Sequence, residues 1–543
     1  MKNAKNVSKK ILGLGILGAT SLVMVACGGG NSGSGNNAAA FDGIEGRYEL
    51  DPNTPAWQLD TREERQTITW FVQAEWWNTT WNEDFVTERI ARDLNIDVEF
   101  RVGGEDVLST IFASGELPDI ISLFDSNSTA ARGASSWALP LNDLAERYDP
   151  YFFNVASRDT LNWFQLESGN TYGFANYSNS FADFYNDTIP ASSAFLVRRD
   201  VYEAIGEMPM STPEEFRAAM TVIREMFPEL EPFGTGAETG TFNFAFMNFI
   251  GVPIVTEDGQ WYDRQLDPAY LDWLRTFSDL HTDGYINDDR FAWDHTVFEE
   301  LVRQGNFATM LVDGMIGLSS SLQVWMSENP GSEYIAIDGP QVPGRSHTLN
   351  QSGISGWMIN YITNQATDPA TAIQLFTYLL SDHGQMLVFF GEEGETFEKL
   401  PNGNVRLLPE IQAMRENDTQ AFQREMRLGE FIPFGHDRFN MMNDQAFLEA
   451  IQQPIEWGRG KLVPQFVIEN INPNPGTPEA MSHQHITQEW DRTLISLIRA
   501  NDHAEFDSII EDFVAFRNNN NFPAIVDVFN ENIQRNMEIL GLN

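Results

Sequence analysis

The sequence is poor in cysteine and in lysine. Cys27 is the only cysteine among 543 residues, so the chain can build neither an internal disulfide nor a metal site of several cysteines. Beyond the first ten residues, lysine occurs only at Lys399 and Lys461, and every other basic residue is arginine. Arginine stays charged at high pH, so an alkaline or saline habitat would explain this bias, and so would genomic base composition.

Basic charge is scarce as a whole. The chain has 78 acidic and 34 basic residues, which gives a net charge of −44. A surface this acidic repels polyanions, which argues against nucleic acid or an anionic membrane as a binding surface. The contents of hydrophobic (42%) and aromatic (12%) residues are nevertheless those of a globular protein, and the length predicts at least two domains.

Sequence motifs of common enzymes are also missing. There is no GxSxG nucleophile elbow and no HExxH zinc motif, and the Gly-Lys pair at 460–461 is followed by Leu462, not by serine or threonine. The histidines at 483, 485 and 503 have the spacing of ordinary surface residues, and no complete calcium-binding loop is present. We therefore predict no catalytic residue, no cofactor and no metal.

The longest apolar run, residues 11–26, follows four lysines within the first ten residues. A positive start, a short apolar run and small residues at its end are typical of an export signal, whereas a membrane span needs about 20 residues. Met24-Val25-Ala26-Cys27 resembles a bacterial lipobox, in which the cysteine receives a diacylglycerol and becomes the first residue. We predict a signal peptide at 1–26 and lipidation of Cys27; a plain secretory signal with an incidental cysteine is the alternative.

The segment after Cys27 supports an anchor. Residues 28–40 contain no charge, no aromatic residue and no large aliphatic residue, so they cannot bury enough apolar surface to become ordered. We predict that 27–60 forms the lipidated cysteine and a flexible tether. The globular body would then stand on the outer face of the bacterial cytoplasmic membrane.

Strand-like and helix-like segments alternate after residue 60. TITWFV (67–72), IDVEFRV (96–102) and DIISLF (119–124) have the composition of strands, and 83–94 carries apolar residues at four-residue spacing, as in an amphipathic helix. The alternation predicts an α/β fold with a mainly parallel sheet and covering helices.

Several helix starts are marked in the sequence. Thr212, Asp267 and Asp368 each precede a proline, which is the order expected of an N-cap followed by the first helical residue. The chain from about 485 to 540 is also predicted to be helical, with a break near 518–523.

The loop QAEWWNTTW (73–81) follows the first predicted strand, at the end where open α/β sheets bind ligands. Trp76 and Trp77 offer flat apolar faces suited to the C–H face of a pyranose, and Glu75 and Asn78 offer hydrogen bonds to hydroxyls. The alternative for each tryptophan is packing in the core or between domains.

The end of the third predicted strand is a second candidate. Asp125, Ser126 and Asn127 follow it and are good partners for hydroxyls, although an Asx turn explains them equally well. Trp70, within the first strand, is predicted to belong to the core.

Long segments occur in a familiar order: ASGELPDIISLFD (113–125), WALPLNDLAERYDPYF (137–152), AFLVRRDVYEAIGEMPMSTPEEFRAAM (194–220), GISGWMINYITNQATDPATAIQLFTYLLSDHGQ (353–385) and FFGEEGETFEKLPNGNVRLLPE (389–410). They resemble extracellular solute-binding proteins of family 1, the lipoproteins that deliver solutes to ABC importers. The resemblance covers most of the chain after residue 65.

The resemblance implies a two-lobed, maltose-binding-like α/β fold in which the chain crosses a hinge more than once. The N-terminal lobe would comprise 61–188 and 330–398, and the C-terminal lobe 189–329 and 399–543. Both lobes are thus expected to be discontinuous.

The resemblance also places Tyr177, Asn179, Asp313 and Trp357 at the cleft between the lobes. The sequence departs from the maltose-binding pattern at 314–317, where Gly-Met-Ile-Gly replaces the tryptophan that often follows this strand. This replacement puts stacking from the second lobe in doubt.

Together these features predict a monomeric, lipid-anchored receptor that captures a carbohydrate, most simply an oligosaccharide, and delivers it to the permease subunits of an ABC importer. Two alternatives remain open at this point. One is a lipoprotein enzyme that acts on polysaccharide, such as a hydrolase or lyase. The other is a receptor of the same fold for a different solute, such as a peptide or polyol.

Overall fold

The computed structural model describes residues 43–542, apart from 127, 167, 187, 236–240, 294, 350–352 and 446. The predicted signal peptide, the predicted lipidation site at Cys27 and the first part of the tether lie outside the described residues. No helix in the described part of the chain is both long enough and apolar enough to span a bilayer.

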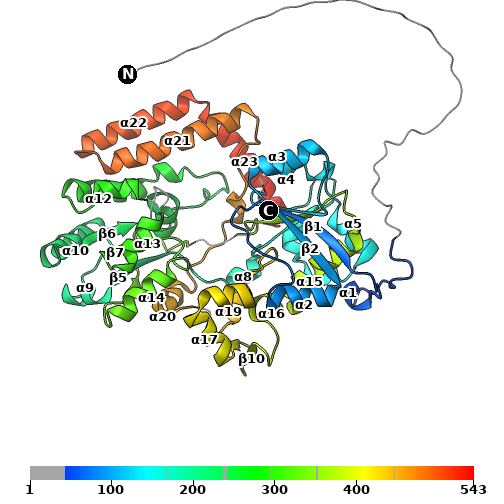
Figure 1. Ribbon diagram of the computed structural model, residues 1–543. Coiled ribbons are helices and arrows are strands. Elements are labelled where there is room, and N and C mark those ends of the chain that lie inside the picture. Colours follow the sequence, from blue (N-terminus) through cyan, green and yellow to red (C-terminus); the bar gives the residue numbers. More distant parts are fainter. Residues whose placement is uncertain are drawn as a thin grey trace, which may run out of the picture. The chain divides into compact units, whose positions relative to one another are not determined.

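A five-stranded sheet of order β2-β1-β3-β9-β4 organises the first lobe (Figure 1). Its strands are β1 (Gln66–Val72), β2 (Ile96–Val102), β3 (Ile120–Leu123), β4 (Gly173–Ala175) and β9 (Ile359–Ile362). β1 pairs in parallel with β2 and β3, as the alternating segments predicted, but β9 runs antiparallel to both β3 and β4. Four of the five strands of this sheet run in the same direction and β9 runs against them, so the sheet is mixed but still mainly parallel in strand direction.

A four-stranded sheet of order β6-β7-β5-β8 organises the second lobe. Its strands are β5 (Ala194–Arg198), β6 (Glu231–Thr235), β7 (Phe307–Val312) and β8 (Tyr334–Ile337). β8 pairs with β5 in this sheet, so the predicted return to the first lobe at residue 330 comes too early. The chain returns only between β8 and β9.

Helices cover both sheets. Those of the first lobe are α1 (Ala56–Leu59), α2 (Phe85–Leu94), α3 (Glu105–Ser114), α4 (Thr129–Arg132), α5 (Leu141–Tyr148), α6 (Phe152–Val155), α7 (Arg158–Trp163), α8 (Phe181–Tyr185), α15 (Pro369–Leu380), α16 (Asp382–Phe390), α17 (Pro409–Asn417), α18 (Thr419–Ala421) and α19 (Asp437–Met442). Those of the second lobe are α9 (Arg199–Ala204), α10 (Pro213–Met226), α11 (Phe246–Phe249), α12 (Pro268–Thr282), α13 (His295–Arg303), α14 (Ser319–Glu328), α20 (Glu449–Gly458), α21 (Pro478–Ile498), α22 (His503–Asn519) and α23 (Phe522–Ile539).

The predicted helix starts are confirmed by their caps. Thr212 forms a capping box with Glu215 at the start of α10, and Asp267 and Asp368 accept hydrogen bonds from the first turns of α12 and α15. The predicted break near 518–523 is the junction of α22 and α23, and a second break, not predicted, separates α21 from α22.

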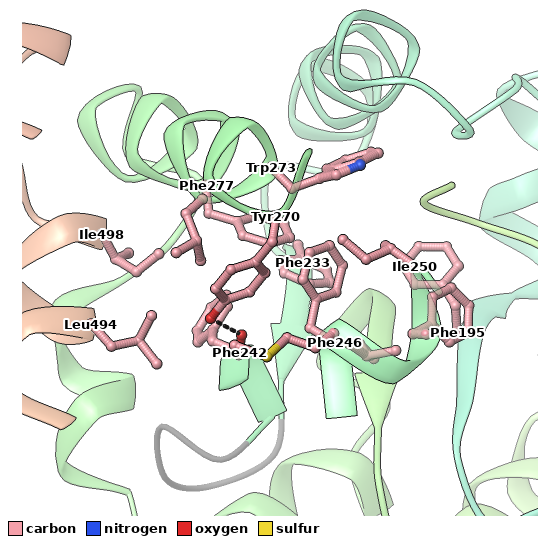
Figure 2. Packing of buried hydrophobic residues seen from close by; sticks show 14 of the residues in the cluster. Phe195, Phe233, Phe242, Phe246, Ile250, Tyr270, Trp273, Phe277, Leu494 and Ile498 are labelled. Atoms are coloured by element: carbon pink, nitrogen blue, oxygen red, sulfur yellow. Dashed lines mark hydrogen bonds between the residues drawn. The ribbon is translucent and has the colours of Figure 1, made fainter. Parts of the chain in front are cut away.

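The core of the second lobe is rich in aromatic side chains. Figure 2 shows Phe233 and Phe277 packed against Tyr270, whose hydroxyl donates a 2.9 Å hydrogen bond to the carbonyl of Phe242. Side chains of α21 pack into the same cluster, which fixes the C-terminal helices to this lobe. Burial of apolar surface on this scale is the main favourable term in folding.

The segment after residue 398 belongs in part to the first lobe, which corrects the predicted boundary. A hairpin, β10 (Phe397–Lys399) with β11 (Val405–Leu407), is followed by α17 to α19, and apolar residues of this stretch join the first-lobe core. Phe431, for example, lies edge-on to Trp70 with ring centroids 6.2 Å apart. Only after α19 does the chain enter the second lobe again, at α20.

The lead-in to the first strand is bound to the first lobe, so the predicted tether ends well before residue 60. Arg47 pairs with Asp60 and, at 2.8 Å, with Asp368 at the start of α15. The backbone N–H of Ala56 donates a 3.1 Å hydrogen bond to the buried carboxylate of Asp149. These partners, distant in sequence, hold residues 47–60 on the lobe.

Candidate ligand-binding site

Four aromatic side chains lie at one edge of the five-stranded sheet. β1 and β3 are parallel, so the loops that follow them, with Trp76 and Phe124, leave the sheet at the same edge. β9 is antiparallel to β3, which brings Trp357, just before β9, to this edge. β4 is antiparallel to β9 and therefore ends there, two residues before Tyr177. Ligands of α/β sheets bind beyond this kind of edge.

These four side chains form a continuous aromatic row. The ring centroids are 5.9 Å apart for Trp76 and Phe124, 5.2 Å for Phe124 and Trp357, and 5.9 Å for Trp357 and Tyr177. Trp76 is 59% exposed and Phe124 is 36% exposed, whereas Trp357 and Tyr177 are half-buried. A row of accessible aromatic faces can stack on the C–H faces of sugar rings.

Tyr177 is held in a conformation that a bulky residue rarely adopts. Its φ of 45° lies in the left-handed region, which costs energy for any residue with a side chain. The backbone N–H of Tyr177 donates a 2.7 Å hydrogen bond to the carbonyl of Gly435. A Cβ atom at Gly435 would lie 2.8 Å from the tyrosine ring, so a glycine is needed there. Strain of this kind is concentrated at functional sites.

A cavity of about 390 Å³ adjoins the inner end of the aromatic row. Tyr177 and Trp357 line it from the first lobe, and Ser192 and Ser319 line it from the second. Asp437 adds a buried carboxyl, whose pKa is raised mainly because burial penalises its charged form. The cavity therefore combines aromatic faces and the Asp437 carboxyl of the first lobe with hydroxyl groups of the second lobe.

The matching edge of the second lobe is polar. Asp313 follows β7 and is exposed, and it accepts a hydrogen bond from the hydroxyl of Ser193, which precedes β5. The two residues meet because Ala194 of β5 lies opposite Val312 of β7 in the antiparallel register. Residues 314–317 supply no aromatic ring here, as the departure from the maltose-binding pattern indicated.

Trp77 does not lie where we expected it. It is 5% exposed and packs against Phe100 and Phe431 in the first-lobe core, with ring centroids 5.9 and 6.1 Å apart. A turn closed by the hydrogen bond from the N–H of Trp77 to the carbonyl of Ala74 separates the two adjacent indoles. The exposed ring that we predicted for Trp77 is supplied by Trp76. Trp70 is fully buried, as predicted.

The polar residues predicted for the site differ in their placement. Glu75, Asn78 and Asp125 are exposed near the aromatic row, in the loops after β1 and β3. Asn179 is fully buried and donates a 2.9 Å hydrogen bond to Asp437, so it joins the two segments and presents no surface to a ligand. Asn127 lies outside the described residues.

Two features of the site were missed by the sequence analysis. Phe124 was treated as the last residue of a strand, although an aromatic residue directly before a polar loop could have indicated a site. Arg427 holds the 75–81 loop, since it bonds Asp84 at 2.9 Å and approaches Asn78 and Thr79 at 3.4 Å. No local pattern could connect residues so distant in the chain.

Within the described residues, no three or more His, Cys, Asp or Glu side chains are grouped so that they could hold a metal ion. The site as described is built from aromatic and polar side chains.

Solved structures with the same two-lobed fold are known, while no curated protein sequence is significantly similar to this chain. One is an HMO binding, ABC-transporter associated solute-binding protein from Bifidobacterium longum infantis (14% identity, 86% of this chain and 98% of that chain, TM-score 0.63). Another is the alginate-binding protein AlgQ2 (14%, 87% and 99%, 0.62), and a third is the substrate-binding protein FusA of Streptococcus pneumoniae in complex with kestose (15%, 86% and 99%, 0.60).

Sequence similarity supports the same relationship. The sequence profile of the bacterial extracellular solute-binding proteins matches residues 76–386, which is more than half of the chain. This family and the structures above are binding proteins and not enzymes, so the alternative of a polysaccharide-acting enzyme is not supported. The matched region contains the aromatic row and all strands of the two sheets except β1, and the chain therefore belongs to the bacterial extracellular solute-binding protein family.

Proposed function

We propose that this protein is a lipid-anchored extracellular receptor that captures an oligosaccharide and delivers it to the permease of an ABC importer. The observation that supports this most is the aromatic row, which ends at a cavity lined by both lobes. Several aromatic faces in series suit several sugar rings better than a single small solute. The saccharides named for the similar solved structures agree with this choice of ligand.

Binding would divide between the lobes. The first lobe stacks on sugar rings through Trp76, Phe124 and Trp357, and the second lobe supplies hydrogen bonds from Ser192 and Asp313. The protein itself carries out no chemical step in this scheme. Its task is to bind the saccharide tightly and to present it in a closed form that the permease recognises.

Closure would occur by hinge motion at the crossings between the lobes. The chain passes from one lobe to the other between α8 and β5, between β8 and β9, and between α19 and α20. Hinges of this type absorb the rotation in a few loop residues while each lobe stays rigid. Ligand should therefore compact the molecule and raise its melting temperature as RT ln(1 + [L]/Kd).

Titration calorimetry of the purified protein against a panel of oligosaccharides tests the proposal. We expect binding of one saccharide per chain, with no product detectable by chromatography after long incubation. A peptide panel and a polyol panel serve as comparisons for the alternative receptor function. Saturable binding to either of these panels, with none to any saccharide, would overturn the choice of ligand.

The lipid anchor needs its own test, because Cys27 lies outside the described residues. Metabolic labelling with a radioactive fatty acid should label the wild-type protein and not Cys27→Ala. The variant should still fold and bind saccharide, since the described body begins well after this cysteine. Label that persists on Cys27→Ala would contradict the anchor.

A further inference from the structure

A second cavity, of about 290 Å³, has an unusual charge for this protein. Its lining includes Arg132 and Arg535 and contains no aspartate or glutamate. In a chain with 78 acidic and 34 basic residues, two arginines without a carboxylate in the same lining are an exception. Such a cavity has a local positive potential within a negatively charged molecule.

Arg535 is the more distinctive of the two arginines. It lies on α23, and Asn532, Asn536 and Ile539 share its face of the helix and line the same cavity. Its guanidinium contacts the amide of Asn536 at 3.3 Å, and no carboxylate of the described residues lies within 4.0 Å of it. By contrast, Arg517 on α22 pairs with Asp263 at 2.6 Å.

Arg132 approaches the cavity from the first lobe, at the end of α4. Its pKa is lowered mainly by burial; Asp125 opposes this shift, and the charge of Arg535 adds to it. The two guanidinium groups therefore repel each other across the cavity. An anion placed between them would relieve this repulsion and gain charge-assisted hydrogen bonds from both sides.

Amide groups complete the lining. Asn472 and Asn474, in the loop before α21, are exposed and belong to the cavity wall. Their amide N–H groups are donors suited to the oxygen atoms of a carboxylate or sulfate. The wall itself presents guanidinium and amide donors and no aspartate or glutamate, with Asp125 as a neighbouring carboxylate beside Arg132. This is the chemistry expected of an anion site.

The cavity adjoins the aromatic row. Ser126, which lines it, follows Phe124 by two residues. Two other lining residues, Trp163 and Asn470, both donate hydrogen bonds to the hydroxyl of Ser355, at 3.1 and 2.9 Å. Ser355 precedes Trp357 of the row by two residues. The loops that carry Phe124 and Trp357 therefore also contact the wall of this cavity.

We propose that this second cavity is a subsite for an anionic group, a carboxylate or a sulfate, on the saccharide that stacks along the aromatic row. The proposal rests on the saccharide-binding function proposed above and narrows it to acidic glycans. Arg535 is the main partner of the anionic group, and Arg132 and the asparagine amides assist it.

Matched pairs of oligosaccharides test this subsite by titration calorimetry. Each pair shares a backbone: xylo-oligosaccharides with and without a glucuronic acid branch, galacturonic acid oligomers with and without methyl esterification, and sulfated and unsulfated galactose oligomers. We expect the acidic member of at least one pair to bind about tenfold more tightly, with a preference that weakens as salt is raised. The pair that shows the preference distinguishes carboxylate from sulfate.

Arg535→Gln should remove the preference and leave the affinity for the neutral member unchanged. Arg303→Gln, at an exposed arginine on α13, is the matched control and should keep the preference. Neutral members that bind as tightly as acidic ones in the wild type, or a preference that survives Arg535→Gln, would overturn the subsite while the proposed function stands. If no saccharide of any pair binds, the proposed function fails and the subsite fails with it.

Discussion

The two lobes present different chemistry at the edges where their parallel strands end. The first lobe offers an aromatic row, whose most exposed member is Trp76, at 59%. The second lobe offers Ser193 and Asp313, and its loop at 314–317 contains no aromatic residue. The proposed binding mode places stacking in one lobe and much of the hydrogen bonding in the other. In this mode a ligand would gain its full affinity only when it touches both edges, which would couple binding to closure.

The largest effect is expected within the first lobe, where the adjacent tryptophans Trp76 and Trp77 differ strongly in burial. Trp77→Ala should lower the free energy of unfolding by about 3–5 kcal/mol, because it leaves a cavity in the core. Trp76→Ala should change stability little, since most of its ring is already in water. Urea denaturation of both variants measures the difference. Equal losses of stability in the two variants would contradict the division between core and edge.

The first lobe also carries a buried titrating group, Asp149, which receives the N–H of Ala56. Burial raises the pKa of this carboxyl from 3.8 to about 6. Between these values the folded protein binds a proton that the unfolded chain releases, so stability falls as pH rises and then levels off. The pKa difference corresponds to about 3 kcal/mol at most.

Asp149→Asn should remove this pH dependence while keeping the hydrogen bond from Ala56. Urea denaturation between pH 4 and 7 measures it in the wild type and the variant. The variant should lose less stability than the wild type as the pH rises over this range. An identical slope in both proteins would show that the carboxyl titrates at its ordinary pKa.

Stacking of the first lobe on a saccharide depends on Trp357, which contacts both Phe124 and Tyr177 in the aromatic row. Trp357→Ala should weaken saccharide binding by about 1–3 kcal/mol, the range of losses for buried interface aromatics. Tyr185→Ala is a suitable control, because this aromatic residue is 75% exposed and lies outside the row. Calorimetric titration should show normal affinity in the control. Normal affinity in Trp357→Ala as well would remove the central member of the row.

Substitution of the hydrogen-bonding groups of the second lobe should have the smallest effect on saccharide affinity. Ser193→Ala removes a hydroxyl that bonds Asp313 and should weaken saccharide binding by about 0.5–1.5 kcal/mol. The radius of gyration of the saturated variant, measured by small-angle scattering, should still show closure. Ser327→Ala, at an exposed serine on α14, is the control for the loss of a hydroxyl of the second lobe that does not bond Asp313.

Local patterns predicted many elements of this fold but not the lobe to which each element belongs. Asp267 and Asp368 mark their helices because a cap and a proline act within one turn of the chain. The stretch 399–442 was assigned to the second lobe, yet its apolar residues pack on the first. Amphipathic character shows that a segment has a buried face, but it does not identify the surface that covers that face.

The candidate site shows the same limit more sharply. The rule for the ends of parallel strands led to the 73–81 loop, and the exposed tryptophan is indeed there. The sequence could not distinguish Trp76 from Trp77, because a loop has no fixed periodicity and a single turn decides which side chain is buried. The sequence likewise could not show that Asn179 is buried, because its partner, Asp437, comes from a distant segment.

The sequence by itself determined the acidic character and the α/β alternation, and it predicts an export signal and the edge at which a ligand should bind. These follow from composition and from interactions within a few residues. Only the tertiary structure decided which aromatic side chains form a row. It also decided that Arg132 and Arg535 line the same cavity. Such groups come from distant parts of the chain, and only the register of the strands and the packing of α23 bring them together.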